Sequence, residues 1–181
     1  MPESLVLNRL PVLHWYAVHT GQGSLPVAVK FNIVLVAPEI PQNTGNIGRI
    51  CVSTNCRLHL IKPYGFILDD KHLRRAGMDY WQYLDVAEYE NWDDFLARNP
   101  GAEMVFFSTR GERTFWDIEY PENLYMVYGN EGHGLPEEFY GRYADNLCII
   151  PMPGDHSRSL NLANSVALGI YEGLRQMEMK K

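Results

Sequence analysis

Short apolar segments alternating with helix-like segments are the feature that most restricts the fold of this chain. The apolar segments are rich in branched and aromatic residues and are bounded by turn formers. Strands that are apolar on both faces are typical of a parallel sheet covered by helices on both sides. We therefore predict an α/β fold with a mostly parallel sheet and strands at 32–38, 57–63, 84–89, 103–109, 124–129 and 146–151.

Helices are predicted between these strands from cap residues and apolar spacing. Asn91 is a good N-cap for the segment that ends before Pro100, and acidic-to-basic polarity followed by Gly77 suits a helix just after the second strand. The segment 38–46 is rich in turn formers and is predicted to be a loop. The predicted helices are 47–55, 69–77, 92–99, 135–144 and 159–177.

Residues 1–30 differ from the remainder of the chain. They show no clear helical or strand period, and they lack the basic start and continuous apolar run of a signal peptide. We predict an N-terminal extension, with a composition compatible with disorder, ahead of a single domain at 31–181.

Composition favours a globular protein of a reducing compartment. The chain is 46% apolar and 21% charged, and no apolar run approaches the roughly 20 residues of a membrane helix. Three cysteines in no zinc or redox spacing are typical of free thiols, which favours the cytoplasm. The six histidines form no paired motif, so we expect no metal.

Charge alone argues against a broadly basic nucleic-acid binder, because the net charge is −6. One local basic cluster is present, at Lys71, His72, Arg74 and Arg75. Without further information, a solvated helix face is the simplest interpretation of this cluster.

Three polar loops follow predicted strands, at 38–49, 128–136 and 150–161. Ligands of open α/β sheets bind at the carboxyl ends of the strands, so these loops are candidates for a binding site. The glycines of the second loop permit close backbone approach to a ligand. They follow the fourth strand rather than the first and lack the GxGxxG pattern and the Walker lysine, which disfavours a classical dinucleotide site.

The third loop leads into the last predicted helix, whose apolar stripe has helical spacing. More small polar residues precede and begin this helix than one cap requires, and Arg158 lies among them. This surplus predicts a site for a polar or anionic ligand. The stripe consists of Ala163, Val166, Ala167, Ile170, Leu174 and Met177, and the polar residues are Ser157, Ser159, Asn161 and Asn164.

Three segments of the chain resemble the motifs of the SpoU (TrmH-like) branch of the SPOUT RNA methyltransferases, in the same order. They are NTGNIGR, YGNEGHGLP and IPMPGDHSRSLNLANSVALGIYE. The stretches PEIPQNTGNIGRICVSTNCRLHLIKPYGF and DDKHLRRAGMDY narrow the resemblance to the TrmL group of small tRNA 2′-O-methyltransferases, which act on the wobble nucleotide. The resemblance covers about residues 31–178.

The resemblance implies a fold and an activity that periodicity alone does not reveal. It implies S-adenosylmethionine (SAM) as methyl donor and the ribose 2′-hydroxyl of cytidine or uridine 34 of tRNA as acceptor. It also implies a C-terminal deep trefoil knot, an exception to the usual connection rules, and a homodimer whose site is completed near the subunit interface.

The resemblance assigns site residues as well. The cofactor would lie among Phe107, Ser108, Thr109, Gly129, Asn130, Glu131, Ile150, Met152, Ser159 and Leu160. The catalytic group would comprise Arg49, Asn43, Ser159 and Asn161. Contacts to tRNA phosphates are expected from Arg49, Lys71, Arg74, Arg75 and Arg158.

Arg49 matches the arginine of the first motif. Arginine is a poor base because it stays protonated, so we expect it to bind phosphate and position the hydroxyl. Two alternatives remain open: a 2′-O-methyltransferase for another tRNA or rRNA position, and a non-catalytic RNA-binding module.

Overall fold

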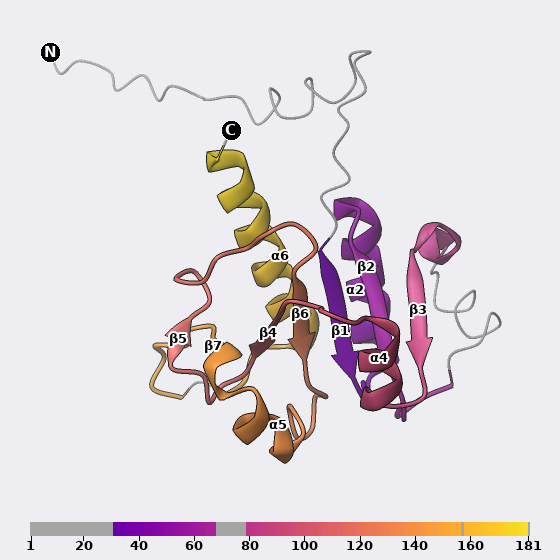
Figure 1. Cartoon of the computed structure of the whole chain (residues 1–181), viewed down its shortest axis with the longest axis horizontal. Helices are drawn as coiled ribbons and strands as arrows, with labels where there is room; N and C mark the ends of the chain where they lie inside the picture. The colour runs from indigo at the N-terminus through magenta and orange to yellow at the C-terminus, as the bar shows by residue number, and fades with distance from the viewer. Residues whose placement is uncertain (1–30, 68–78, 157, 181) are drawn as a thin grey trace, which may run out of the picture.

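The computed structural model describes residues 31–67, 79–156 and 158–180, and within them it contains one seven-stranded sheet (Figure 1). The strand order is β3-β2-β1-β6-β4-β7-β5, and every ladder is parallel. The predicted parallel α/β fold is confirmed, and the trefoil knot stays a prediction. The strands are β1 (Asn32–Val36), β2 (Arg57–Ile61), β3 (Val86–Tyr89), β4 (Met104–Phe107), β5 (Arg113–Thr114), β6 (Tyr125–Tyr128) and β7 (Leu147–Ile149).

Helices cover both faces of this sheet (Figure 1). Helices α2 and α6 pack on one face and against each other, whereas α4 and α5 lie on the other face. Two short 3-10 helices, η1 and η2, complete the described elements. The bounds are α2 (Pro41–Thr54), η1 (Asp79–Tyr83), α4 (Trp92–Arg98), α5 (Glu137–Arg142), η2 (Ala144–Asn146) and α6 (Leu162–Met179).

Successive side chains along each strand point to opposite faces of the sheet. In β1, Ile33 and Leu35 point to the α2/α6 face, whereas Val34 and Val36 point to the α4/α5 face, and all are buried. Each such side chain contributes about 1.5–3 kcal/mol by leaving water. The apolar stripe predicted for the last helix is confirmed, because Ala163, Val166 and Ile170 are buried in the α2/α6 layer and the other three members are partly buried.

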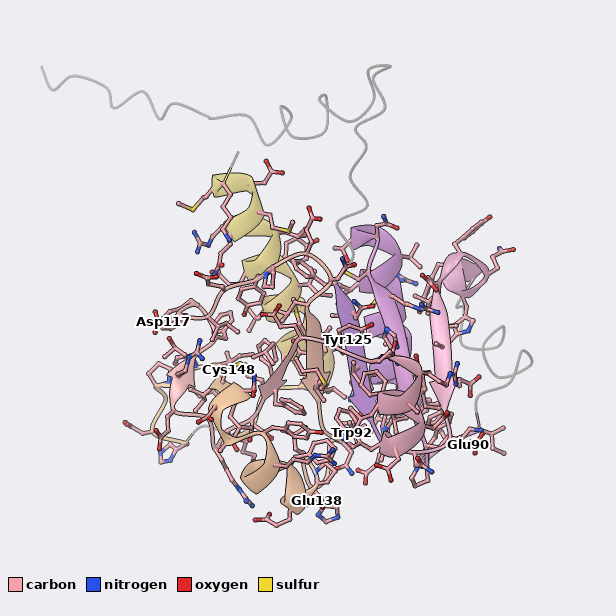
Figure 2. The ribbon with its side chains drawn as sticks, viewed as in Figure 1. Glu90, Trp92, Asp117, Tyr125, Glu138 and Cys148 are labelled. Atoms are coloured by element: carbon pink, nitrogen blue, oxygen red, sulfur yellow. The ribbon has the colours of Figure 1, made fainter. Side chains whose placement is uncertain are left out.

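An aromatic cluster joins the two helices of the opposite face. Trp92, labelled in Figure 2, packs its ring 4.6 Å from that of Phe139, and its indole N–H donates to the hydroxyl of Tyr143 at 2.9 Å. Asn91 caps α4 as predicted, with its side chain accepting from the amide of Asp94 at 2.9 Å.

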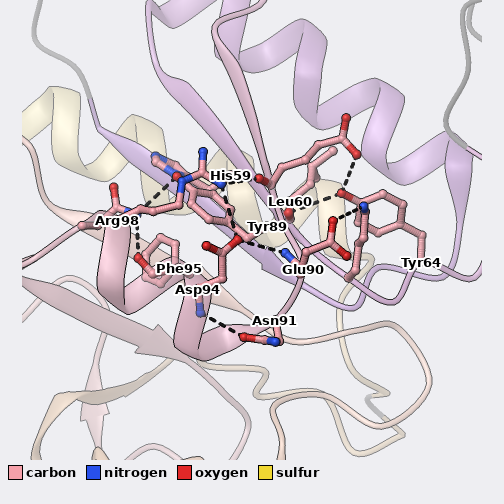
Figure 3. A network of polar contacts seen from close by, with 12 residues as sticks. His59, Leu60, Tyr64, Tyr89, Glu90, Asn91, Asp94, Phe95 and Arg98 are labelled. Carbon is pink, nitrogen blue, oxygen red and sulfur yellow. Dashed lines mark hydrogen bonds and ion pairs between the residues drawn. The ribbon is translucent and has the colours of Figure 1, made fainter.

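One histidine is fully buried beneath α4 (Figure 3). The ring nitrogens of His59 lie 2.8 Å from the hydroxyl of Tyr89 and 3.0 Å from the side-chain oxygen of Asn32. Burial lowers the pKa of His59 to about 4, with a smaller contribution from the positive charge of Arg57. His59 is therefore neutral and serves as a hydrogen-bonding element of the core.

Several predicted boundaries were wrong. Helix α2 begins at Pro41 instead of 47, so most of the predicted loop is helical, and α6 begins at Leu162 instead of Ser159. Pro41 at the first turn favours a helix start, because its fixed φ suits that position. Residues 79–83 form a 3-10 helix, and β3 begins at Val86 instead of Leu84. The predicted helix 69–77 and the predicted extension 1–30 lie outside the described residues.

Strand β5 was not predicted. It contains only two residues, and its pairing with β7 defines it rather than any local pattern. Among the described residues, no helix is both long and apolar enough to cross a membrane.

Candidate active site

A cavity of about 530 Å³ lies at the carboxyl ends of β4, β6 and β7. Its walls come from the segments 107–110, 128–135 and 149–165, with Ile40 and Asn43 from the start of α2. The sequence-based expectation that ligand-binding loops gather at this edge of the sheet agrees with the position of the cavity.

All ten residues that the resemblance assigns to the cofactor line this cavity. They come from three segments far apart in the sequence, and the structure brings them together. The ten are Phe107, Ser108, Thr109, Gly129, Asn130, Glu131, Ile150, Met152, Ser159 and Leu160.

Two stacked rings form part of the cavity wall. Phe107 and Tyr128 are paired residues at the ends of β4 and β6, and their ring centroids lie 4.5 Å apart at 16°. Gly169 of α6 leaves room for them, because a Cβ there would lie 2.4 Å from the hydroxyl of Tyr128. The small residue in α6 therefore allows a flat aromatic wall.

The glycine-rich loop after β6 folds back on itself. The backbones of Asn130 and Gly134 exchange hydrogen bonds of 3.1 and 3.0 Å. A Cβ on Gly129 would lie 1.9 Å from the carbonyl carbon of Gly134, so only glycine fits at position 129. Gly134 has a φ of 75°, which also favours glycine. The expected close backbone approach occurs within the loop itself.

Glu131 joins this loop to the start of α2. Its carboxylate accepts hydrogen bonds from the amides of Glu39 (2.8 Å) and Ile40 (3.3 Å) and from the side-chain amide of Asn43 (2.8 Å). In return, the carboxylate of Glu39 accepts from the amide of Gly132 at 3.0 Å. The N-cap Ile40 has no capping side chain, so Glu131 supplies an acceptor and a negative charge at this helix N-terminus.

The same contacts extend to α6 through two asparagines. The side-chain oxygen of Asn43 accepts from the side-chain amide of Asn161 at 2.9 Å. The oxygen of Asn161 accepts from the amides of Ala163 (2.9 Å) and Asn164 (3.3 Å), so Asn161 is the N-cap of α6. Glu131, Asn43 and Asn161 thus connect all three sequence motifs, and we call them the Glu–Asn–Asn chain.

Arg49 lies outside the cavity wall. It is exposed on α2, and its guanidinium carbon lies 4.9 Å from the centroid of the Tyr80 ring. Asn43, Ser159 and Asn161 line the cavity, so the structure brings together three of the four residues of the expected catalytic group. Arg158 is exposed, whereas Lys71, Arg74 and Arg75 lie outside the described residues.

Sequence reasoning missed part of the wall. Arg110 donates to both carboxylate oxygens of Glu137 at 2.9 Å and lies 4.2 Å from the centroid of the Tyr140 ring. The hydroxyl of Ser108 donates to that of Tyr140 at 3.2 Å. Arg110 directly follows the predicted strand end, which was a usable signal, whereas the involvement of Tyr140 depends on how α5 packs.

Residues 30–171 match the model of the SpoU rRNA Methylase family. The chain belongs to this family. The SpoU match includes the first two motifs, the third motif up to Tyr171, and every strand of the sheet.

Individual SpoU relatives and related structures cover the same domain. A protein of Saccharophagus degradans named tRNA (cytidine(34)-2'-O)-methyltransferase is 47% identical over 148 residues, which are 81% of this chain and 96% of that protein. A structure described as "Structural insights into the 2-OH methylation of C/U34 on tRNA" is 41% identical with a TM-score of 0.78, covering 84% of this chain and 99% of that one.

The chain is also similar to a cofactor-bound protein. The structure of an AdoMet-bound rRNA methyltransferase from Sinorhizobium meliloti is 27% identical with a TM-score of 0.69. It covers 81% of this chain and 56% of that one.

Proposed function

We propose that the protein is a SAM-dependent tRNA (cytidine/uridine-34) 2′-O-methyltransferase. The observation that carries this proposal is the convergence of three separate motifs on one cavity at the carboxyl edge of the sheet. Relatives named for this activity match nearly their whole length, which supports the substrate assignment.

The cavity suits SAM in size and chemistry. A volume of about 530 Å³ lies within the usual range for sites of cofactor-sized ligands. Phe107, Ile150 and Leu160 provide apolar surface for the adenine and the methionine chain. Ser108, Asn130 and the backbone of the 128–135 loop provide polar groups that fix orientation.

Bound SAM supplies an electrophilic methyl group on its sulfonium sulfur. The protein must place a ribose hydroxyl in line with that methyl, and positioning of this kind supplies a large part of the rate. Asn43, Ser159 and Asn161 border the cavity where a ribose would enter, and the Glu–Asn–Asn chain holds two of them in place. The guanidinium of Arg49 binds phosphate and stabilises the developing negative charge near the hydroxyl.

Arg49 can act at a cavity only if that cavity belongs to a second subunit. It does not line the cavity of its own chain, and its exposed side chain lies over the ring of Tyr80. Leu168 and Tyr171 of α6 are large apolar side chains that are 42% and 54% exposed. We propose that α2 and α6 form a homodimer interface that brings Arg49 of the partner subunit to each cavity.

The tRNA surface extends from this interface. Arg158 is exposed in the segment between β7 and α6, next to the cavity residue Ser159, where it is suited to a phosphate of the substrate. Lys71, Arg74 and Arg75 remain proposed phosphate contacts. The place of action is proposed to be the cytoplasm, where tRNA and SAM are both present.

Calorimetry with SAM, followed by methyl transfer from labelled SAM to bulk tRNA, tests this proposal. We expect one SAM site per chain and labelled tRNA. Labelled rRNA with unlabelled tRNA would support 2′-O-methyl transfer but would assign rRNA as the substrate. SAM binding without any RNA product would indicate a non-catalytic module, and absence of SAM binding would refute the proposal.

A further inference from the structure

The 3-10 helix η1 is fixed against α2 by two contacts. The hydroxyl of Tyr80 donates to the carbonyl of Gly45 at 2.6 Å. The ring of Trp81 lies over Gly48, where even an added Cβ would approach it to 3.0 Å. These contacts anchor η1 on α2 and hold the Tyr80 ring near its hydrogen-bond partner Gly45.

The fixed ring of Tyr80 faces Arg49, with the guanidinium carbon 4.9 Å from the ring centroid. A cation at this distance from an aromatic face is attracted by the ring electrons. An exposed arginine otherwise samples many rotamers. This conformational freedom is lost when the guanidinium must meet a phosphate in one geometry. A ring that restricts the side chain beforehand reduces this loss when substrate arrives.

We propose that Tyr80 is a positioning residue for Arg49. Its ring holds the guanidinium in the orientation that meets the tRNA, and its hydroxyl, bonded to Gly45, holds the ring. The inference rests on the proposed function, because it assigns Tyr80 a role through an arginine that acts in methyl transfer. Tyr80 itself touches neither SAM nor the reacting hydroxyl, since no residue of η1 lines the cavity.

The test compares Tyr80→Leu with Tyr80→Phe in the full chain, with SAM and unmodified tRNA. Tyr80→Leu should lower kcat about 5-fold, the upper end expected for loss of one cation–π contact at an exposed site. It should leave SAM affinity unchanged. Tyr80→Phe keeps the ring and should stay within about 3-fold of the unsubstituted protein. Tyr83→Leu is the matched control, because Tyr83 lies in the same 3-10 helix with 74% exposure, and it should retain full activity.

Two further measurements separate positioning from folding. Phenylalanine analogues with one, two and three ring fluorines at position 80 keep the shape of the ring but weaken cation binding stepwise, so log kcat should fall in step. In a double-mutant cycle on tRNA affinity rather than turnover, Tyr80→Leu should weaken tRNA binding little once Arg49→Ala is present, because both changes remove the same contact. Circular dichroism and SAM binding verify that each variant is folded.

The possible failures are distinguishable. Equal kcat across the fluorinated series, or additive effects of Tyr80→Leu and Arg49→Ala, would overturn the role of Tyr80 while leaving the proposed function intact. Normal turnover of Arg49→Ala would overturn the role of Tyr80 together with that of Arg49. Absence of tRNA methylation by the unsubstituted protein would overturn the proposed function itself.

Discussion

The link between Glu131 and the start of α2 gives the most quantitative prediction. Glu131→Gln keeps the size of the side chain, but one carboxylate oxygen becomes an amide donor. If that donor replaces the oxygen facing Glu39, two N–H groups oppose each other and the 2.8 Å hydrogen bond is lost. The contacts to Ile40 and Asn43 remain, but they lose the charge that strengthens them.

The size of the effect follows from these contacts. A hydrogen bond to a charged group is worth about 1.5–3 kcal/mol, and partial exposure of Glu131 favours the lower end. We therefore expect Glu131→Gln to lower the free energy of unfolding by about 2 kcal/mol. For a domain of this size, about 2 kcal/mol corresponds to a decrease in Tm of roughly 4–8 °C.

Urea denaturation at neutral pH measures this difference directly. Glu122→Gln, an exposed loop carboxylate, is the matched control and should change stability by less than about 0.5 kcal/mol. Because Asn43 and Glu131 share a hydrogen bond, Asn43→Ala combined with Glu131→Gln should be less destabilising than the sum of both. A change for Glu131→Gln no larger than the control, or strict additivity, would refute the proposed link.

Three further predictions concern other parts of the molecule. Gly129→Ala should abolish SAM binding in calorimetry and leave little folded protein, because its Cβ would overlap the backbone of Gly134. The pKa of His59 is about 4 in the folded protein and near 6.5 when unfolded, so the unfolded state binds more protons between these values. Its stabilising contribution is complete above pH 6.5, and about 3 kcal/mol should be lost as pH falls to 4, measured by urea denaturation. Arg49→Ala should abolish tRNA methylation while SAM affinity in calorimetry stays within about 3-fold, because Arg49 lies off the cavity wall.

Each of these has an informative control. His59→Gln should remove most of the additional pH dependence, and an unchanged pH profile in this variant would assign it to other groups. Gly141→Ala, where an added Cβ meets nothing within 4 Å, should fold normally beside Gly129→Ala. Near-normal turnover of Arg49→Ala would remove Arg49 from the chemistry.

The parallel sheet and the cavity wall were predictable because their determinants are local or carried by long motifs. Val34 and Leu35 belong to a run that is apolar on both faces, which already requires two covering layers. Pro41 was a usable signal for the start of α2, but this N-terminus is also stabilised by Glu131, which lies 91 residues from Ile40 in the sequence. Tertiary contacts of this kind override the loop propensity of Asn43 to Asn46.

The position of Arg49 shows a second limit of sequence reasoning. Asn43 and Arg49 are the first and last residues of the motif NTGNIGR. Their positions around the helix determine which surface each side chain reaches. Asn43 lines the cavity and Arg49 does not. Only the packing of η1 on α2 reveals that Arg49 instead faces the ring of Tyr80.

Mapping of the methylated nucleotide tests the central claim most directly. Unmodified tRNA would be incubated with the protein and SAM, digested with a ribonuclease, and the fragments sequenced by mass spectrometry. The account predicts a gain of one methyl group on the ribose of nucleotide 34, as cytidine or uridine, and none with Arg49→Ala. A methyl group on any other nucleotide, or none with SAM binding intact, would contradict it.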